Sequence, residues 1–270
     1  MAWRIIALFT TSAFALLRQV HTRFERLTFR AYRRLTPVSR IFGLDRGQSI
    51  CRYYVEQFLR LYATDIRGRV LEIGDDRYTK MFGDKRVTNS EVLHAEDGNP
   101  RATITADLTR NLAVPSDHFD CIILTQTLPF IFDVRTAILS LHRILKPGGV
   151  LLVTLSGISQ ISRFDMQRWG EYWRFTSLSG RLLFEEQFPA SELIIQTYGN
   201  VLAATAYLYG FAAEELSQRE LNHHDSDYEL LITVRARKPT SLDVRGIGTK
   251  NVYIFLFLQV VSEVASLPVI

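Results

Sequence analysis

The sequence predicts an α/β domain built on a doubly wound, mostly parallel sheet. Short runs that are almost entirely apolar, such as residues 119–125, recur along the chain. Such runs are typical of strands in a parallel sheet that is covered on both faces. They alternate with segments whose apolar residues recur at helical spacing, and this alternation is typical of doubly wound folds. We therefore expect helices on both faces of the sheet.

The first predicted strand lies within residues 69–76 (RVLEIGDD). Val70, Leu71 and Ile73 predict a short buried strand, and Gly74 marks the tight turn that a strand needs before a following helix. In open α/β sheets, ligands bind outside the carboxyl ends of the strands. We therefore expect the turn at Gly74 to lie at a ligand site.

The other elements follow in order. Ser49 is expected to cap a helix over residues 50–61. Asp133 is expected to cap a second helix, which ends at the Lys-Pro-Gly-Gly sequence of residues 146–149. A further helix is expected within residues 201–216. The aromatic segment 157–176 predicts a lid or substrate wall. The remaining strands are predicted at residues 87–92, 102–106, 119–125, 150–155, 193–198 and 228–236.

The chain divides into three parts by charge and apolarity. Residues 1–48 form a basic N-terminal arm with an apolar helix, residues 49–238 the main domain, and residues 239–270 an apolar C-terminal extension. Residues 1–70 hold 13 Arg against 4 acidic residues, a net charge of +9, which leaves −5 for the rest. No basic groove interleaved with aromatic residues follows, which argues against nucleic-acid binding.

Both ends of the chain carry apolar runs that are too short to span a bilayer. Residues 5–17 predict a helix that packs on the domain or lies on an anionic membrane surface, with a signal peptide or organellar presequence as further alternatives. Residues 252–261 predict packing against the core or a partner first, membrane contact second, and a non-native extension third. Peripheral membrane contact through the arm therefore stays open.

The composition predicts a large core and a cytoplasmic protein. The chain has 270 residues, of which 47% are hydrophobic and 22% are charged. Cys51 and Cys121 lie far apart without the spacing of metal ligands, so both are expected to be reduced thiols, and no metal site is expected.

The turn at Gly74 is poorly suited to a pyrophosphate. A dinucleotide-binding turn uses three glycines so that the phosphates approach the start of a helix, but Asp76 and Tyr78 stand where further glycines would fall. Asp75 and Asp76 would also repel phosphate. The turn favours a ligand that carries positive charge and hydroxyl groups.

Five short pieces of the sequence occur in a characteristic order: Val70-Leu71-Glu72-Ile73-Gly74, Glu91, Ala106-Asp107-Leu108, residues 115–120 (PSDHFD) and residues 141–150 (LHRILKPGGV). In the order and spacing of these pieces, the chain resembles, over residues 49–237, the class I S-adenosylmethionine-dependent methyltransferases, in particular their small-molecule, type 11-like branch. The resemblance implies a Rossmann-like methyltransferase sheet with an antiparallel edge strand, and a methyl transfer to a small molecule or glycan. The segment 165–184 also resembles methyltransferases associated with glycosyltransferases in surface-polysaccharide biosynthesis.

The resemblance implies that S-adenosyl-L-methionine is the cofactor. The turn with Glu72, Gly74 and Asp75 would face its methionine portion. Glu91 would accept hydrogen bonds from both ribose hydroxyls, with a helix cap or solvated turn residue as the alternative.

Beyond the third strand, the resemblance implies that Asp107 accepts a hydrogen bond from the adenine amino group. Leu108, the next residue, belongs to the same predicted cofactor site. A capping role is the alternative for Asp107. Gln126 and Thr127 would line the sulfonium and the transferred methyl group.

Acceptor contacts are expected from Trp169, Tyr172 and Arg174, because aromatic faces stack on sugars and planar rings and Arg binds carboxylate or phosphate. These aromatics could instead simply cover the sheet edge. No catalytic base is identified, and His94 is a weak candidate. Asp76 replaces a glycine that is usual in the family, so the alternative function is a non-catalytic binding or scaffold protein with this fold.

Overall fold

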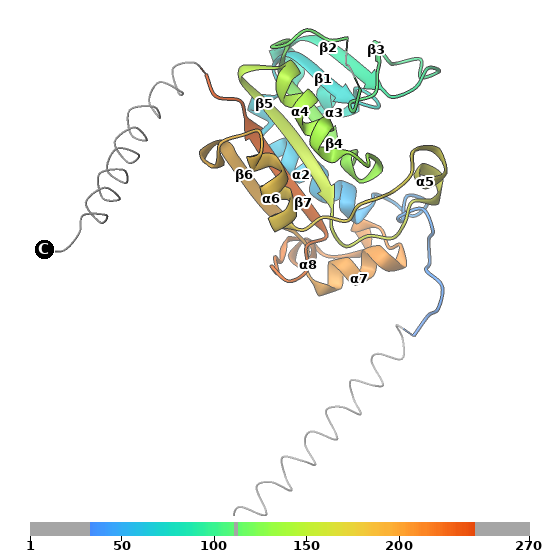
Figure 1. Ribbon diagram of the computed structural model, residues 1–270. Coiled ribbons are helices and arrows are strands. Elements are labelled where there is room, and N and C mark those ends of the chain that lie inside the picture. Colours follow the sequence, from blue (N-terminus) through green and yellow to red (C-terminus); the bar gives the residue numbers. More distant parts are fainter. Residues whose placement is uncertain (1–32, 111–112, 241–270) are drawn as a thin grey trace, which may run out of the picture.

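The computed structural model describes residues 33–110 and 113–240 (Figure 1). A seven-stranded sheet in the order β3-β2-β1-β4-β5-β7-β6 forms its centre. Neighbouring strands are parallel, except that β7 is antiparallel to both β5 and β6. This confirms the predicted fold class, with the antiparallel strand one place in from the edge. The strands are β1 (Gly68–Ile73), β2 (Val87–His94), β3 (Ile104–Thr105), β4 (Phe119–Thr125), β5 (Leu145–Ser156), β6 (Leu193–Tyr198) and β7 (Leu231–Arg237).

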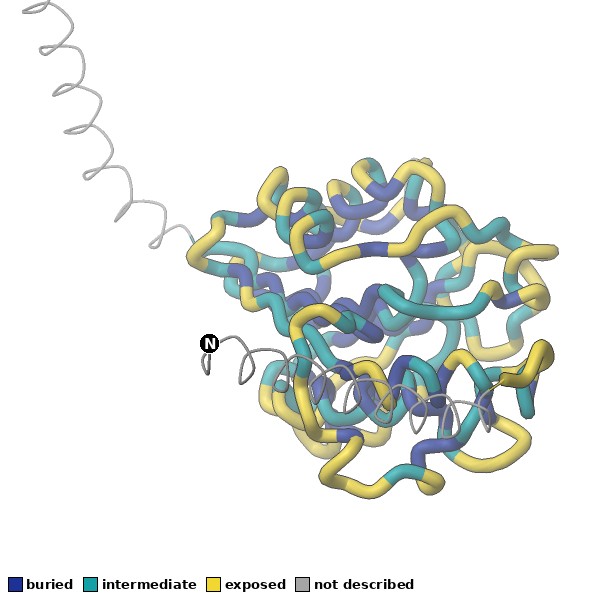
Figure 2. The backbone as a smooth tube through the Cα atoms, turned by 90° about the horizontal axis from the view of Figure 1, so that it is seen from below, coloured by how far each residue is buried: buried dark blue, intermediate teal, exposed yellow. Residues whose placement is uncertain are grey.

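Helices cover both faces of the sheet, as predicted. Strand residues alternate between two hydrophobic cores: Leu71 of β1 packs in the core that includes α4 and α6, and its neighbour Val70 packs in the core that includes α2, α3, α7 and α8. In Figure 2 the buried stretches lie in the interior and the exposed ones around them. The helices are α2 (Ile50–Leu61), α3 (Arg77–Phe82), α4 (Val134–Ile144), α5 (Arg163–Trp169), α6 (Ser177–Glu185), α7 (Val201–Tyr209) and α8 (Gln218–Asn222).

The predicted elements agree with the observed ones except at their ends. β2 extends to His94, two residues beyond its predicted end. The sequence at residues 146–149 belongs to β5 instead of a separate turn, because Leu145 already pairs with Phe119 of β4. The predicted helix over residues 201–216 ends as α7 at Gly210, which has the left-handed conformation common after helix ends (φ +81°).

The segment before α2 packs on the end of α7 and on the residues that follow it. The Val38 N–H donates to the carbonyl of Tyr209 at 2.7 Å, and the Ala213 N–H donates to the carbonyl of Gln48 at 2.7 Å. Arg46 forms an ion pair with Glu215. The segment thus becomes one wall of the site described below. The division of the chain at residues 48 and 238 stays a prediction.

The apolar runs 5–17 and 252–261 lie outside the described residues. Within the described residues, no helix is long and apolar enough to cross a membrane. The same part of the chain has no group of three or more His, Cys, Asp or Glu side chains that could hold a metal ion. Both cysteines are free thiols, as expected.

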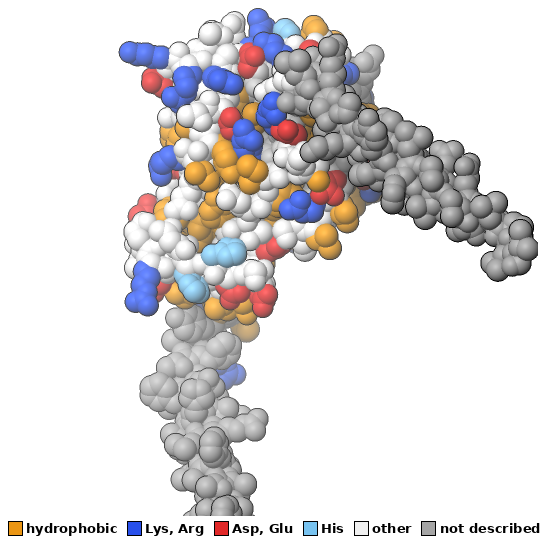
Figure 3. All heavy atoms as spheres, turned by 90° about the vertical axis from the view of Figure 1, so that its left-hand side faces the viewer, with side chains coloured by type: hydrophobic (Ala, Val, Ile, Leu, Met, Phe, Trp, Pro, Cys, Tyr) orange, Lys and Arg blue, Asp and Glu red, His pale blue; other side chains and the backbone are white. Residues whose placement is uncertain are grey.

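The surface near α6 and β6 is partly apolar. Leu178 and Leu182 of α6 and Ile194 of β6 are exposed. On the face shown in Figure 3, hydrophobic side chains gather near the middle, with charged side chains of both signs around them.

Candidate active site

The turn after β1 holds an open position at Gly74. Gly74 has φ +92°, and a Cβ built on it would meet no protein atom within 4 Å. Its N–H donates to the carbonyl of Leu93 at 2.9 Å, and its carbonyl accepts from Nδ2 of Asn99 at 2.7 Å. Both backbone groups are thus fixed, while the side that lacks a side chain borders a cavity.

Glu72 supports this turn from behind. Its side chain is buried, and its carboxylate accepts hydrogen bonds from the N–H of Tyr78 (3.1 Å) and from the N–H (2.7 Å) and hydroxyl (2.8 Å) of Thr79. Burial raises the pKa of Glu72 to about 7, although these hydrogen bonds act in the opposite direction. Glu72 does not line the cavities beside the turn, so it holds the start of α3 instead of facing the ligand.

The two aspartates that follow Gly74 lie differently. Asp75 lines the cavity, and its Oδ1 accepts from the N–H of Arg77 at 3.1 Å. Asp76 is outside the cavity linings, and its carboxylate pairs with Lys80 at 2.6 Å. The acid that replaces the family's glycine therefore does not fill the space in front of the turn.

A cleft with two chambers runs along the carboxyl ends of the strands. The first chamber has a volume of about 400 Å³ and is walled by α2, the start of α3, the last turn of α7 and the segment before α2. The second, about 810 Å³, lies over the ends of β2, β3 and β4. Five residues line both chambers and therefore mark their junction: Ile73, Gly74, Gln126, Phe130 and Asp165.

The second chamber contains Asp107 and Leu108, as the sequence predicts. Oδ1 of Asp107 accepts from the N–H and the hydroxyl of Thr109, both at 2.8 Å, and Oδ2 lies 3.3 Å from Nε of Arg110. Asp107 thus caps its own turn and also borders the cavity. Leu108 is buried and provides an apolar surface beside it.

Glu91 is not in the cleft, which corrects the prediction of its place. It lies within β2 opposite Leu71, and its Oε1 is 2.8 Å from Arg69 and 4.0 Å from His118. Because β2 continues to His94, its carboxyl end lies two residues beyond the predicted end and three residues after Glu91. Glu96 is the carboxylate that follows the strand and lines the second chamber.

Gln126 and Thr127 lie where β4 ends. Gln126 has φ +50°, a conformation uncommon for residues other than glycine and often found at functional sites. Its N–H donates to Oγ1 of Thr154 at 3.0 Å, and its side-chain Oε1 accepts from the hydroxyl of Ser156. Thr127 donates to the carbonyl of Thr125 at 3.1 Å and lines the second chamber.

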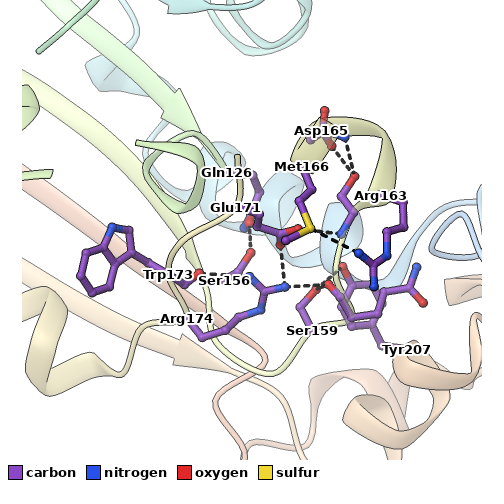
Figure 4. A network of polar contacts seen from close by, with 12 residues as sticks. Gln126, Ser156, Ser159, Arg163, Asp165, Met166, Glu171, Trp173, Arg174 and Tyr207 are labelled. Carbon is purple, nitrogen blue, oxygen red and sulfur yellow. Dashed lines mark hydrogen bonds and ion pairs between the residues drawn. The ribbon is translucent and has the colours of Figure 1, made fainter. Parts of the chain in front are cut away.

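The α5 segment, residues 157–176, lines both chambers, and Figure 4 shows polar contacts that several of its side chains make. Trp169 and Tyr172 line the second chamber, and the Trp169 ring meets the ring of His94 edge-on, with centroids 5.4 Å apart. Arg174 lines neither chamber. It forms an ion pair with Glu171 at 2.6 Å and donates to the carbonyl of Gln160 at 2.7 Å. Arg174 thus fastens the segment and does not face the cavity.

His94 faces the wrong chamber for a base that acts at the junction. Its Nδ1 lies 2.7 Å from the carbonyl of Glu96, and its ring packs against Trp169 in the second chamber. His142 is a packed residue, as expected, since its ring contacts Phe188 with centroids 4.9 Å apart and burial lowers its pKa.

Residues 44–153 match a family model described as a methyltransferase domain. This match covers β1 to β4 and most of β5, including Gly74, Asp107 and Gln126, and the sheet has the expected mixed architecture. Residues 44–153 are thus similar to methyltransferase domains, in agreement with the resemblance to the class I S-adenosylmethionine-dependent methyltransferases.

Solved methyltransferase structures resemble this chain in fold. One is an S-adenosylmethionine-dependent methyltransferase from Archaeoglobus fulgidus, 11% identical, with a TM-score of 0.47 over 69% of this chain and 94% of that one. Another is the N-methyltransferase NodS from Bradyrhizobium japonicum WM9 in complex with S-adenosyl-L-homocysteine, 19% identical, with a TM-score of 0.45 over 72% of this chain and 90% of that one. No curated protein sequence matches this chain.

Three residues of this methyltransferase cleft were not anticipated from the sequence. Glu171, whose side chain is only 6% exposed, and Asp165 reach the first chamber from the α5 segment, and Arg52 reaches it from α2. The sequence placed Glu171 directly before Tyr172, so the aromatic cluster was the available signal. No sequence signal identified Arg52.

Proposed function

We propose that this chain is an active methyltransferase that transfers the methyl group of S-adenosylmethionine to a small molecule or glycan. The observation that carries the proposal is the cleft itself. The second chamber lies over β2, β3 and β4, and the first chamber lies between α2 and the α5 segment. The two chambers meet at Gly74 and Gln126. A cofactor and an acceptor could therefore occupy separate chambers and meet at one point.

The residues of the second chamber suit a nucleoside. Carboxylates accept hydrogen bonds from hydroxyl and amino groups, and Asp107 and Glu96 are available for the adenine and the ribose. Leu108 and Ala106 provide apolar contacts for the adenine ring. The open position at Gly74, which any Cβ would fill, admits the ligand close to the backbone. When bound, S-adenosylmethionine supplies a methyl group already activated on a sulfonium.

The protein's own contribution is to orient the acceptor and exclude water. Gln126 and Asp165 line both chambers and are in position to contact groups at the junction. Ser156 fixes the Gln126 side chain, and Ser162 donates to Asp165. Asp165 is a better candidate than His94 for the hydrogen-bond partner of an acceptor hydroxyl, because it borders the first chamber.

The first chamber suits a polar acceptor. Hydroxyl groups of Ser159 and Tyr207 line it together with the carboxylate of Glu171, while Phe42 and Leu44 offer apolar contacts. This combination of hydrogen-bonding groups and aromatic or aliphatic surface is compatible with a sugar or another small polyhydroxylated molecule. Trp169 and Tyr172 remain proposed contacts near the second chamber, and Arg174 is proposed to act only through Glu171.

Calorimetric titration of the full chain with S-adenosylmethionine and S-adenosylhomocysteine tests the proposal. Both should bind, and incubation with S-adenosylmethionine and an accepted glycan should release S-adenosylhomocysteine. A folded sample that gives no heat with either ligand would refute the enzyme and its cofactor together. Binding without turnover on a broad acceptor panel would favour the non-catalytic alternative.

Membrane contact through the N-terminal arm stays a separate proposal. Its basis is the positive charge and apolar run of the sequence before residue 35. The full chain should sediment with anionic vesicles, and a chain lacking residues 1–34 should not. Equal sedimentation of the two proteins would exclude the arm as the membrane-binding element.

A further inference from the structure

We propose that the folded domain docks on an anionic membrane surface through a face beside the first chamber. This docking face consists of exposed side chains from the segment before α2 and from the α5 segment. It is distinct from the N-terminal arm, because all of its residues belong to the described domain. Its members are Arg40, Ile41, Ile161, Arg163, Phe164 and Arg168.

A direct contact joins the two segments that carry the docking face. Nε2 of Gln160 donates to the carbonyl of Arg40 at 2.9 Å, and Figure 1 shows the segment before α2, in blue, beside the α5 segment. Ile41 and Ile161, which follow these two residues, are 54% and 46% exposed. The residue after each isoleucine lines the first chamber. The two exposed isoleucines therefore lie close to each other and to that chamber.

Helix α5 places an aromatic ring and two positive charges at exposed positions. Phe164 is 65% exposed, and the guanidinium of Arg168 lies over its ring, 3.4 Å from the centroid. Arg163 is also exposed and contacts the sulfur of Met166. Asp165, the acid of this helix, lines both chambers. Exposed apolar side chains beside arginines are typical of helices that lie at a membrane interface.

The charge of the docking face favours an anionic partner. Arg40, Arg163 and Arg168 are exposed, and none of them forms an ion pair with another described residue. Asp45 is the only exposed acid within residues 33–47 and 157–170. A surface of apolar side chains and unpaired arginines matches a bilayer, which offers negative headgroups above apolar acyl chains.

The N-terminal arm enters the domain through the same face. Residues 1–34 hold seven arginines against one acid, and the chain then continues directly to Arg40. Two elements that bind one surface together hold it more strongly than either does alone. A membrane is therefore one partner that suits both the arm and the docking face. The first chamber would then receive its acceptor from the bilayer side, a consequence that rests on the proposed function.

Quenching of tryptophan emission by brominated lipids tests the docking face without cofactor or turnover. The chain has three tryptophans: Trp3 in the arm, and Trp169 and Trp173 in the α5 segment. Trp3→Phe in the full chain removes the signal of the arm. Phe164→Trp in this background adds an indole on the docking face. Leu61→Trp is the matched control, because Leu61 is 59% exposed at the end of α2 and lines neither chamber.

The vesicles contain phosphatidylglycerol and phosphatidylcholine with brominated acyl chains. Apolar side chains of an interfacial helix lie roughly 5–10 Å into the boundary between headgroups and acyl chains. The vesicles should therefore quench most of the emission that Phe164→Trp adds and little of the emission that Leu61→Trp adds.

The double variant Arg163→Gln, Arg168→Gln tests the charge of the docking face. An arginine near an anionic surface strengthens binding by about fivefold, so this variant should bind the vesicles about 25-fold more weakly. The double variant Arg60→Gln, Arg67→Gln is the control. It removes the same charge from exposed positions outside the docking face and should keep the affinity of the unchanged protein.

Three results would overturn the proposal. Vesicle binding without quenching of the emission added by Phe164→Trp would show that the arm alone anchors the chain. Equal quenching with Leu61→Trp would show that the domain has no preferred face toward the membrane. A full chain that does not bind anionic vesicles would exclude a membrane as the partner. Binding of S-adenosylhomocysteine is measured separately, so failure of the proposed function would leave the result with vesicles unchanged.

Discussion

Replacing Gly74 with alanine would place one methyl group at the centre of the cleft. The new Cβ would meet no protein atom within 4 Å, so the side chain itself causes no clash in the folded protein. The backbone must still keep φ at +92°, which an L-residue adopts at a cost of roughly 1–2 kcal/mol. For a domain of this size, that corresponds to a fall in melting temperature of about 2–8 °C.

Gly148→Ala provides a matched control. Gly148 has φ +79°, and a Cβ there would meet only Cγ2 of Thr240, at 3.3 Å. It lies near the start of β5, whereas the cleft follows the carboxyl ends of the strands, and it lines neither chamber. Both variants should therefore lose a similar amount of stability. Only Gly74→Ala should lose affinity for S-adenosylhomocysteine, by about tenfold or more, because only its methyl group occupies ligand space.

Thermal melts with and without ligand measure this difference. A ligand at 100 times its Kd stabilises the native state by about 2.7 kcal/mol, and a tenfold weaker Kd reduces that to about 1.4 kcal/mol. The shift in melting temperature produced by S-adenosylhomocysteine should therefore fall by about half in Gly74→Ala and stay at the wild-type value in Gly148→Ala. Equal ligand-induced shifts in both variants would refute the placement of the ligand against Gly74.

Asp107→Ala should weaken the binding of S-adenosylhomocysteine by about 1–3 kcal/mol, because one hydrogen bond is lost. Calorimetry measures this change, and an unchanged affinity would remove Asp107 from the ligand site. Glu96→Gln should also weaken binding whereas Glu91→Gln should not, and the reverse order would restore the original assignment of the ribose contact. The pKa of Glu72, raised to about 7 by burial, means that the folded state binds more protons than the unfolded state above about pH 4.5. Glu72 should therefore reduce stability as pH rises from 4.5 through 7, by up to about 3 kcal/mol, and urea unfolding of Glu72→Gln over this range should lack that slope.

The order of strands and helices could be predicted from the sequence because it depends on local patterns. The apolar run of β4 and the helical spacing in α4 each lie within one short stretch, and Asp133 caps α4 as its position predicts, accepting from the N–H of Thr136 at 3.1 Å. The ends of elements were less predictable. Leu145 belongs to β5 because it pairs with Phe119 of a neighbouring strand, a contact that no local pattern shows.

The candidate site was predicted well only where chain direction alone positions a residue. Gly74 and Gln126 directly follow strands and Asp107 comes two residues after β3, so they reach the carboxyl edge whatever the details of packing. The prediction that Glu91 lies in the site was wrong because the position of this residue depends on where β2 ends. Arg52 was missed because it reaches the chamber from a helix that precedes β1, and only tertiary packing brings that helix beside the turn.

The structure also supplies a second reason why the turn after β1 is unsuited to a pyrophosphate. Dinucleotide-binding turns offer the N–H groups at the start of the following helix to phosphate oxygens. Here the carboxylate of Glu72 already accepts from the N–H groups of Tyr78 and Thr79 at the start of α3. The turn can therefore admit a ligand beside Gly74 but has fewer donors left for an anion.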